Sequence, residues 1–327
     1  MGVLLNLIYI IAGFVLLIKG ADFLVTGASS LAKKLHISEL AIGLTIVAMG
    51  TSAPELVVNI YSSYQGLSDV VFGNIIGSNI FNLFLILGVA GLIYPLYVQR
   101  NTVYIEIPFS MVITLVLIFL LNDATFWGGK HNGLSWIDGS ILLGLFVLFL
   151  LYVFRSMRKS GDMGEVDEME VYSNSYTAVI LMGGVIGLAA GGVLIVENAV
   201  TVARAFSVSE KLIGLTLLAA GTSLPELATT AVAAFQKKSD IAVGNVIGSN
   251  IFNILLVLGV SSLVSEMEYN TVLNTDLWLV VGGTVLLLLF NFTFNRFRLD
   301  RYEAGLYLLG FFTYMFFLFY REQEILF

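Results

Sequence analysis

The chain has 327 residues, of which 58% are hydrophobic and only 12% are charged, and its mean hydropathy is +0.92. A soluble protein carries about a quarter of charged residues, so this composition excludes an ordinary soluble domain and predicts a membrane protein. Cysteine is absent and only two histidines occur, which excludes disulfides and thiolate metal sites, and the net charge of −7 gives no basis for a nucleic-acid partner.

Apolar runs long enough to cross a bilayer recur along the chain. A transmembrane helix needs about 20 largely apolar residues. Ten runs meet this requirement, near residues 4–27, 38–64, 69–94, 103–121, 136–154, 176–203, 209–235, 239–264, 274–294 and 303–320. We therefore predict an all-α membrane protein with ten transmembrane helices. Its five-helix halves are expected at 1–154 and 176–327, joined by a cytoplasmic linker loop at 155–175.

The distribution of basic residues predicts the orientation of these helices. With the N-terminus outside, eleven of the 16 Lys and Arg residues lie in inward loops and four lie in outward segments. Cytoplasmic loops carry an excess of Lys and Arg, so this is the expected topology. The first run has no basic region before it and is interpreted as a retained span rather than a signal peptide. We expect a multi-pass protein of the cell (inner) membrane.

A duplication lies within the two halves. Residues 43–88 and 214–259 align without a gap at an offset of 171, with 25 identities in 46 positions. The offset carries the chain from the second span to the seventh, and this odd number of crossings inverts the second copy. Inverted repeats with a binding site near the bilayer midplane are a recurring plan of transporters. The sequence therefore predicts two inverted five-helix repeats and a transporter.

The residues kept in both copies are mostly polar or helix-breaking, whereas apolar positions vary. A purely structural repeat would keep its packing residues instead. Pro54 and Pro225 fall inside their spans, where proline removes one backbone hydrogen bond. Broken helices at membrane depth line cavities or are buried in protein. We expect these breaks to free the carbonyl oxygens of Ala48 and Ala219.

Each copy also carries one glutamate inside its span, Glu55 and Glu226. An ionised carboxylate there costs at least about 2.5 kcal/mol. The second, third, seventh and eighth spans contain no Lys or Arg apart from Lys211 at an entrance. The charge must then be met by bound cations or by protons. Two glutamates match one divalent ion or two or more monovalent ions, so these residues favour a cation site over two protonated structural acids.

Further oxygen-bearing side chains are spaced four residues apart, which places them on shared helix faces. The four faces carry Thr51, Glu55 and Asn59; Asn74, Ser78 and Asn82; Thr222, Glu226 and Thr230; and Asn245, Ser249 and Asn253. Hard cations such as Ca2+ take about six to eight oxygen ligands, and Na+ accepts the same ligand type. Asn79 and Asn250 lie about 100° further round their helices and are expected to form hydrogen bonds between helices.

The doubled GTS-x-PE and GN-x-IGSNIFN segments resemble the paired alpha repeats of the calcium/cation antiporter superfamily, particularly its prokaryotic sodium/calcium exchangers. The motifs are long, doubled and in the family's order, and the resemblance extends over essentially the whole chain. It implies alternating access at one central site, with the first and sixth spans moving against the other helices. Ca2+ and Na+ would be the transported ions, without a cofactor.

The resemblance also implies a set of ligands. Glu55 and Glu226 look like the paired glutamates that bind Ca2+ and share the Na+ ions. The surrounding oxygen ligands would be the hydroxyls of Thr51, Ser52, Ser78, Thr222, Ser223 and Ser249 and the carbonyls of Ala48 and Ala219. Asn253 stands where potassium-dependent and certain archaeal members carry an aspartate, and Asn82 is likewise an amide. We include both amides in the expected metal site, and this departure implies potassium independence.

Sodium-driven Ca2+ exchange is the first functional hypothesis. Proton/Ca2+ exchange is the second, because two glutamates can release protons as readily as sodium. Exchange of other cations, a channel and a membrane enzyme are the remaining classes. An enzyme would need a nucleophile and a base, whereas no His lies inside an expected span and no Cys exists, so we do not expect an enzyme. The expected partners are Ca2+, Na+ or H+, and the lipid bilayer.

Overall fold

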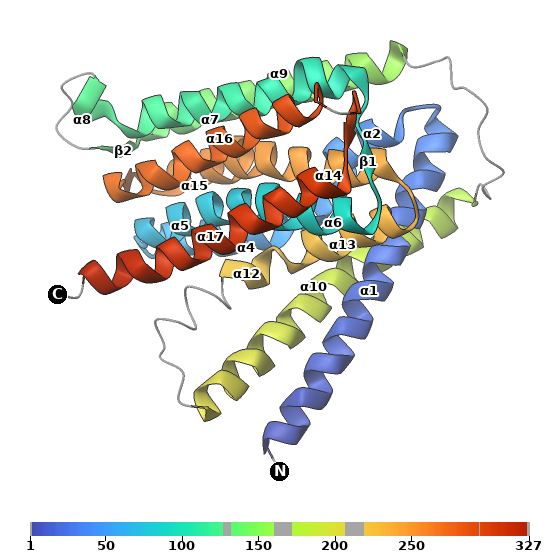
Figure 1. Ribbon diagram of the computed structural model, residues 1–327, viewed down its shortest axis with the longest axis horizontal. Helices are drawn as coiled ribbons and strands as arrows, with labels where there is room; N and C mark the ends of the chain where they lie inside the picture. The colour runs from blue at the N-terminus through green and yellow to red at the C-terminus, as the bar shows by residue number, and fades with distance from the viewer. Residues whose placement is uncertain (1, 127–131, 160–171, 207–218, 294, 326–327) are drawn as a thin grey trace.

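The computed structural model describes residues 2–126, 132–159, 172–206, 219–293 and 295–325 (Figure 1). Within these ranges the protein is mostly helical, and eight helices are long and apolar enough to cross a membrane. The bent pair Glu39–Thr51 and Ala53–Tyr64 makes a ninth span if it is counted as one. The expected span at 209–235 begins outside the described residues, so ten helices remain a prediction.

The helices follow the predicted order. Those of the first half are α1 (Gly2–Leu35), α2 (Glu39–Ile42), α3 (Ala48–Thr51), α4 (Ala53–Tyr64), α5 (Ser68–Ile80), α6 (Leu87–Ile93), α7 (Ile107–Leu121), α8 (Asp123–Phe126) and α9 (Trp136–Lys159). Those of the second half are α10 (Asn174–Ala205), α12 (Ala219–Thr222), α13 (Leu224–Phe235), α14 (Ser239–Phe252), α15 (Leu258–Val264), α16 (Asn274–Phe290) and α17 (Arg301–Ile325). Helix therefore extends into the predicted linker 155–175 from both ends.

Short stretches of other helix types join several of these elements. The stretches Gly43–Val47, Phe81–Ile86, Thr102–Glu106 and Asn253–Val257 are π-helical, and Thr271–Leu273 is a 3-10 turn. Phe81–Ile86 joins α5 to α6, and Asn253–Val257 joins α14 to α15, so that each pair forms one continuous span. Single-turn π insertions are rare and are often found at functional sites.

Helices α1 and α10 form a long, tightly packed pair. They contain 34 and 32 residues, so each is roughly 50 Å long, which exceeds the ~30 Å hydrocarbon core and requires tilt. Figure 1 shows them side by side and inclined to the other helices. A Cβ atom at Gly20 would lie 2.7 Å from the backbone nitrogen of Leu188, so the two backbones are in contact. Small residues permit such close packing in membranes.

The helices that carry the predicted site residues lie at the centre of the protein. In α14–α15, 94% of the most apolar window is buried, against 22% in α1. Figure 1 places α5, α14 and α15 between the α1–α10 pair and helices α7, α9 and α16. Polar side chains on the central helices therefore face protein rather than lipid, which is where intramembrane polar residues are tolerated.

Two short antiparallel ladders depart from the prediction of an all-α protein. β1 (Leu96–Tyr97) pairs with β4 (Arg298–Leu299), and β2 (Gly133–Leu134) pairs with β3 (Met267–Glu268). Strands of two residues show no alternation of polar and apolar residues, so the sequence gives no signal for them. Each ladder connects the first half of the chain to the second and fixes the halves to one another.

Candidate cation site

Both helix breaks predicted from the prolines are present. A single residue, Ser52, separates α3 from α4, and the two segments are bent by 48°. Ser223 likewise separates α12 from α13, with nearly the same backbone angles (φ −90° and ψ 3°, against φ −83° and ψ 5°). Each break places a glutamate, Glu55 or Glu226, in the first turn of the following helix. The positive end of the helix dipole favours a negative charge there.

The carbonyl of Ala48 differs from the expectation. It accepts the backbone N–H of Ser52 at 2.9 Å and lies 3.2 Å from the hydroxyl oxygen of Thr51, so the prediction that the break frees this oxygen was wrong. Proline removes the hydrogen bond to the carbonyl four residues earlier, which for Pro54 is that of Gly50. Ala219 is the first residue of α12, at the edge of the described residues, and its role stays a prediction.

The serine at the first break bonds to the opposite repeat. Ser-x-x-Glu is the pattern of a capping box, in which the serine would bond to its own helix. Ser52 makes no such bond. Its hydroxyl instead donates to Oε1 of Glu226 at 2.9 Å and lies 3.1 Å from Oγ of Ser249. The second repeat's glutamate is thus held by the first repeat's serine.

The second repeat makes the equivalent contacts in return. The hydroxyl of Ser223 donates to Oε1 of Glu55 at 3.4 Å and lies 3.0 Å from Oγ of Ser78. All six side chains of the two sets are at most 3% exposed. Ser52 and Ser223 each stand three residues before the glutamate of their own repeat, so the two sets lie next to each other along both chain segments. The structure therefore brings six of the predicted site residues into one buried cluster.

The predicted site threonines also form hydrogen bonds with asparagines of the opposite repeat. The hydroxyl of Thr51 donates to Oδ1 of Asn245 at 3.1 Å, and Nδ2 of Asn74 donates to the hydroxyl of Thr222 at 3.1 Å. Nδ2 of Asn59 donates to Oδ1 of Asn74 at 2.8 Å. Helical spacing placed these asparagines on the correct faces, but they were not included among the expected ligands. The signal that marks Asn74 and Asn245 is their presence in both copies.

Asn82 and Asn253, the two amides that depart from the family pattern, form hydrogen bonds with neighbouring helices. Nδ2 of Asn82 donates to Oδ1 of Asn250 at 2.9 Å, and Nδ2 of Asn253 donates to Oδ1 of Asn79 at 3.1 Å. Asn79 and Asn250 therefore form the interhelical bonds expected of them. Asn82 and Asn253 lie in the π-helical stretches Phe81–Ile86 and Asn253–Val257.

Five buried oxygen atoms on these residues have no hydrogen-bond partner: Oε2 of Glu55, Oε2 of Glu226, and Oδ1 of Asn59, Asn82 and Asn253. A buried acceptor without a partner costs about 1–3 kcal/mol, and more when it is charged. No lysine or arginine in the described ranges forms an ion pair with either glutamate. Within the same ranges, no group of three or more His, Cys, Asp or Glu residues could hold a metal. The donor set is thus two carboxylates with neutral oxygens, which suits a hard cation.

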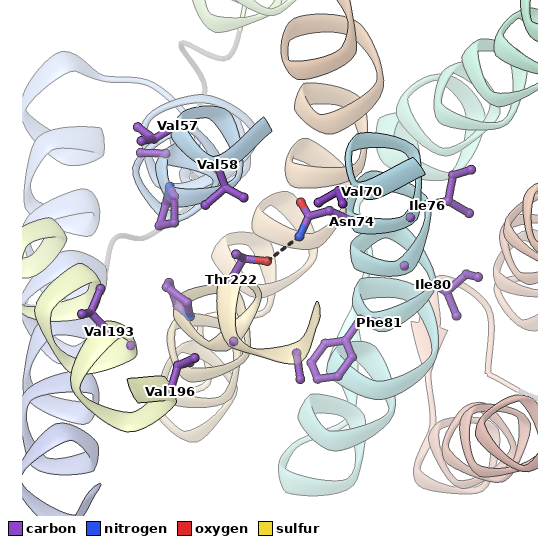
Figure 2. Close-up of a pocket in the computed structure, with 18 of the residues that line it drawn as sticks. Val57, Val58, Val70, Asn74, Ile76, Ile80, Phe81, Val193, Val196 and Thr222 are labelled. Atoms are coloured by element: carbon purple, nitrogen blue, oxygen red, sulfur yellow. Dashed lines mark hydrogen bonds between the residues drawn. The ribbon is translucent and has the colours of Figure 1, made fainter. Parts of the chain in front are cut away.

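A cavity of about 1190 Å³ adjoins this cluster. Figure 2 shows its largely apolar wall and the hydrogen bond between Asn74 and Thr222 that faces it. Asp69 and Glu197 add carboxylates to the lining, whereas neither site glutamate reaches it. The lining also includes Pro54 and Pro225, the residues that precede the two site glutamates.

Comparison with known proteins gives a consistent result. The model of the sodium/calcium exchanger protein family matches residues 5–155 and 176–320. The chain is 32% identical to the sodium/calcium exchanger MaX1 of Methanosarcina acetivorans, over 96% of this chain and 99% of that protein. It is 37% identical to the inner membrane protein YrbG of Escherichia coli, over 79% of this chain and 80% of that protein. A solved structure of the sodium-calcium exchanger NCX_Mj superimposes with a TM-score of 0.81 at 33% identity, covering 96% of this chain and 98% of that chain.

Proposed function

This chain belongs to the sodium/calcium exchanger protein family, and on that premise we propose that it is a secondary active antiporter exchanging Na+ for Ca2+. The observation that carries the proposal is how the carboxyl oxygens of Glu55 and Glu226 are partnered. Each has one oxygen held by a serine of the opposite repeat and one buried oxygen without a partner. Cations are the ligands that such oxygens lack.

Charge balance explains why one site would exchange the two ions. Two ionised glutamates carry −2, which one Ca2+ or at least two Na+ neutralise. Leaving the carboxylates ionised and empty costs at least about 2.5 kcal/mol each within the membrane. The ion-loaded site therefore switches between the two sides of the membrane more readily than the empty site. Ca2+ and Na+ compete for the same oxygens, so release of one requires binding of the other.

We infer the finer architecture from the duplication. Ten transmembrane helices in two inverted five-helix repeats, 1–154 and 176–327, account for the offset of 171 and for the reciprocal serine contacts. The family match leaves out 156–175, in agreement with a linker at 155–175. The basic residues place the N-terminus outside. The inner membrane protein among the relatives supports placement in the cell (inner) membrane.

Contacts on the two sides of the site support alternating access. The cavity of about 1190 Å³ lies on the side of Asp69 and Glu197, which is the outer side in this topology. On the inner side, Nε2 of Gln236 on the segment after α13 donates to Oδ1 of Asp22 on α1 at 2.8 Å. This bond ties the mobile α1–α10 pair of the proposed cycle to the site-bearing helices on the inner side.

Proton/Ca2+ exchange is the second candidate, and one feature favours it. The unpartnered Oε2 atoms of Glu55 and Glu226 can accept protons as well as metal ions. Both versions use the same fold and the same glutamates, so they differ only in the ion that replaces Ca2+.

The test is Ca2+ uptake into proteoliposomes of the purified protein, driven in turn by an outward Na+ gradient and an outward H+ gradient. Uptake with the Na+ gradient alone supports sodium exchange, and uptake with the H+ gradient alone moves the protein to the proton-coupled candidate. Glu55→Gln and Glu226→Gln should each abolish uptake, because each leaves a single carboxylate. Glu266→Gln, at an exposed position between α15 and β3, is the matched control and should transport normally. Near-normal uptake by either site variant would remove the proposed site.

A further inference from the structure

A third buried carboxylate with an unsatisfied oxygen lies away from the central site. Glu106 immediately precedes α7 and is 2% exposed. Its Oε1 accepts a hydrogen bond from the hydroxyl of Tyr152 on α9 at 2.5 Å, whereas its Oε2 has no partner. Thr102, four residues earlier and on the same helix face, adds a buried hydroxyl beside this carboxylate.

Glu106 faces a small cavity of about 20 Å³. Oxygen-bearing side chains make up most of its lining: Ser38, Gln99, Asn101, Glu106, Tyr152 and Ser156. Leu40, Ala41, Leu44 and Val153 complete it, so none of the residues that line this cavity is Lys, Arg or His. A space of this size holds about one water-sized body. It therefore admits a small dehydrated ion but not a hydrated one.

A buried carboxylate near the start of α16 is satisfied in a different way. Asp276 lies at the start of α16, as Glu106 lies just before α7, and is also 2% exposed. Arg321 on α17 pairs with it, Nη2 lying 3.1 Å from Oδ2. Glu106 has the hydroxyl of Tyr152 in place of a guanidinium. Among the described residues, Lys238 pairs with Glu39 on α2, Nζ lying 3.0 Å from Oε1.

We infer that Glu106, Tyr152 and the polar residues around this cavity form a separate binding site for one Na+ ion. One carboxylate balances one monovalent cation, whereas a divalent ion would leave an excess positive charge in the membrane. A buried carboxylate is neutralised by a proton, a paired charge or a metal ion, and the oxygen-rich lining without a basic residue favours the metal ion. Hydroxyl and amide oxygens provide the remaining ligands of a hard cation. The site lies at the inner ends of α2, α7 and α9, away from Glu55 and Glu226.

Binding of 22Na+ to the purified full-length chain tests this inference without relying on transport. The background is the double variant Glu55→Gln with Glu226→Gln, measured at pH 8 with choline as the replacement cation. One Na+ per chain should remain bound in this background. Adding Glu106→Gln should abolish it, whereas adding Glu39→Gln, a neighbouring carboxylate that pairs with Lys238, should leave it unchanged. Absence of Na+ binding in the double variant, or its retention after Glu106→Gln, would overturn the site.

Tyr152→Phe in the same background keeps the carboxylate and covers the case in which Glu106→Gln does not fold. Loss of its hydroxyl should weaken the remaining Na+ binding by about tenfold, the scale of losses for groups that orient a metal ligand. An unchanged affinity in a folded Tyr152→Phe protein contradicts the proposal. Failure of Na+-driven Ca2+ uptake would contradict the proposed function but would not affect this result, since both central glutamates are absent from the background.

Discussion

Gly184→Ala examines whether α1 and α10 are held in backbone contact. A Cβ atom at Gly184 would lie 2.7 Å from the backbone nitrogen of Leu24 and 2.9 Å from the carbonyl oxygen of Gly20. Backbone atoms cannot rotate away as the end of a side chain can. To lengthen the shorter contact from 2.7 Å to an ordinary 3.4 Å, the two helices must separate by at least 0.7 Å.

The neighbouring residue supplies the matched control. Gly183 has nothing within 4 Å of a Cβ atom, although it lies in the same helix. Replacing glycine by alanine inside a helix stabilises it by about 1 kcal/mol, and this gain applies to both positions. Overpacking costs about 1–3 kcal/mol and applies only to Gly184→Ala. The difference in unfolding free energy between the two variants should therefore be about 1–3 kcal/mol.

Thermal unfolding of both variants in one detergent, followed by Ca2+ uptake in proteoliposomes, measures the two consequences. Gly183→Ala should unfold at or above the temperature of the unmodified protein, and Gly184→Ala below it. Uptake should fall in Gly184→Ala alone, because the widened pair no longer fits the helices around it. Equal unfolding temperatures for the two variants would refute the inference of backbone contact.

Three further substitutions address the central site. Ser52→Ala removes a 2.9 Å hydrogen bond to Glu226, whereas Ser223→Ala removes a 3.4 Å hydrogen bond to Glu55. Hydrogen bonds to charged groups contribute about 1.5–3 kcal/mol. Ser52→Ala should therefore raise the half-saturating Ca2+ concentration by about tenfold, and Ser223→Ala should raise it by less. An equal or larger effect of Ser223→Ala in uptake assays would count against this reading. Asn253→Asp adds a third carboxylate and removes the donor to Asn79, so Ca2+ flux should become sensitive to K+ or change its Na+ stoichiometry. The exposed control Asn270→Asp should not alter either property. If Asn253→Asp and Asn270→Asp show the same Ca2+ flux, the prediction is contradicted.

The sequence alone predicts the central features because they depend on residue type and on repetition. Glu55 and Glu226 are apparent because a carboxylate in an apolar span is costly, and the duplication selects the same position twice. The broken helices follow from Pro54 and Pro225, since proline cannot supply the missing hydrogen bond. Helix faces follow from the spacing of four residues, which places Ser78 and its equivalents toward the centre.

The remaining features depend on distances between helices, about which the spacing of residues carries no information. Comparison of the two copies pairs Ser52 with Ser223, but the contact in the structure joins Ser52 to Glu226, which are not equivalent positions. The capping-box pattern would even assign Ser52 to its own helix. Likewise, α1 extends to Leu35 beyond the expected end at residue 27, and Ser30 in this extension lies 3.4 Å from the hydroxyl of Thr177 on α10.

The exchanged serine contacts connect the duplication to a transport cycle. The glutamate of each half is held by a serine of the other half, so the site exists only where the two halves meet. Alternating access by inverted repeats requires the two halves to exchange conformations around a fixed site. Equivalent contacts then differ in length in any one state. In the proposed cycle, the 2.9 Å bond from Ser52 and the 3.4 Å bond from Ser223 would form such a pair, and reversal of access would exchange the tighter bond from Glu226 to Glu55.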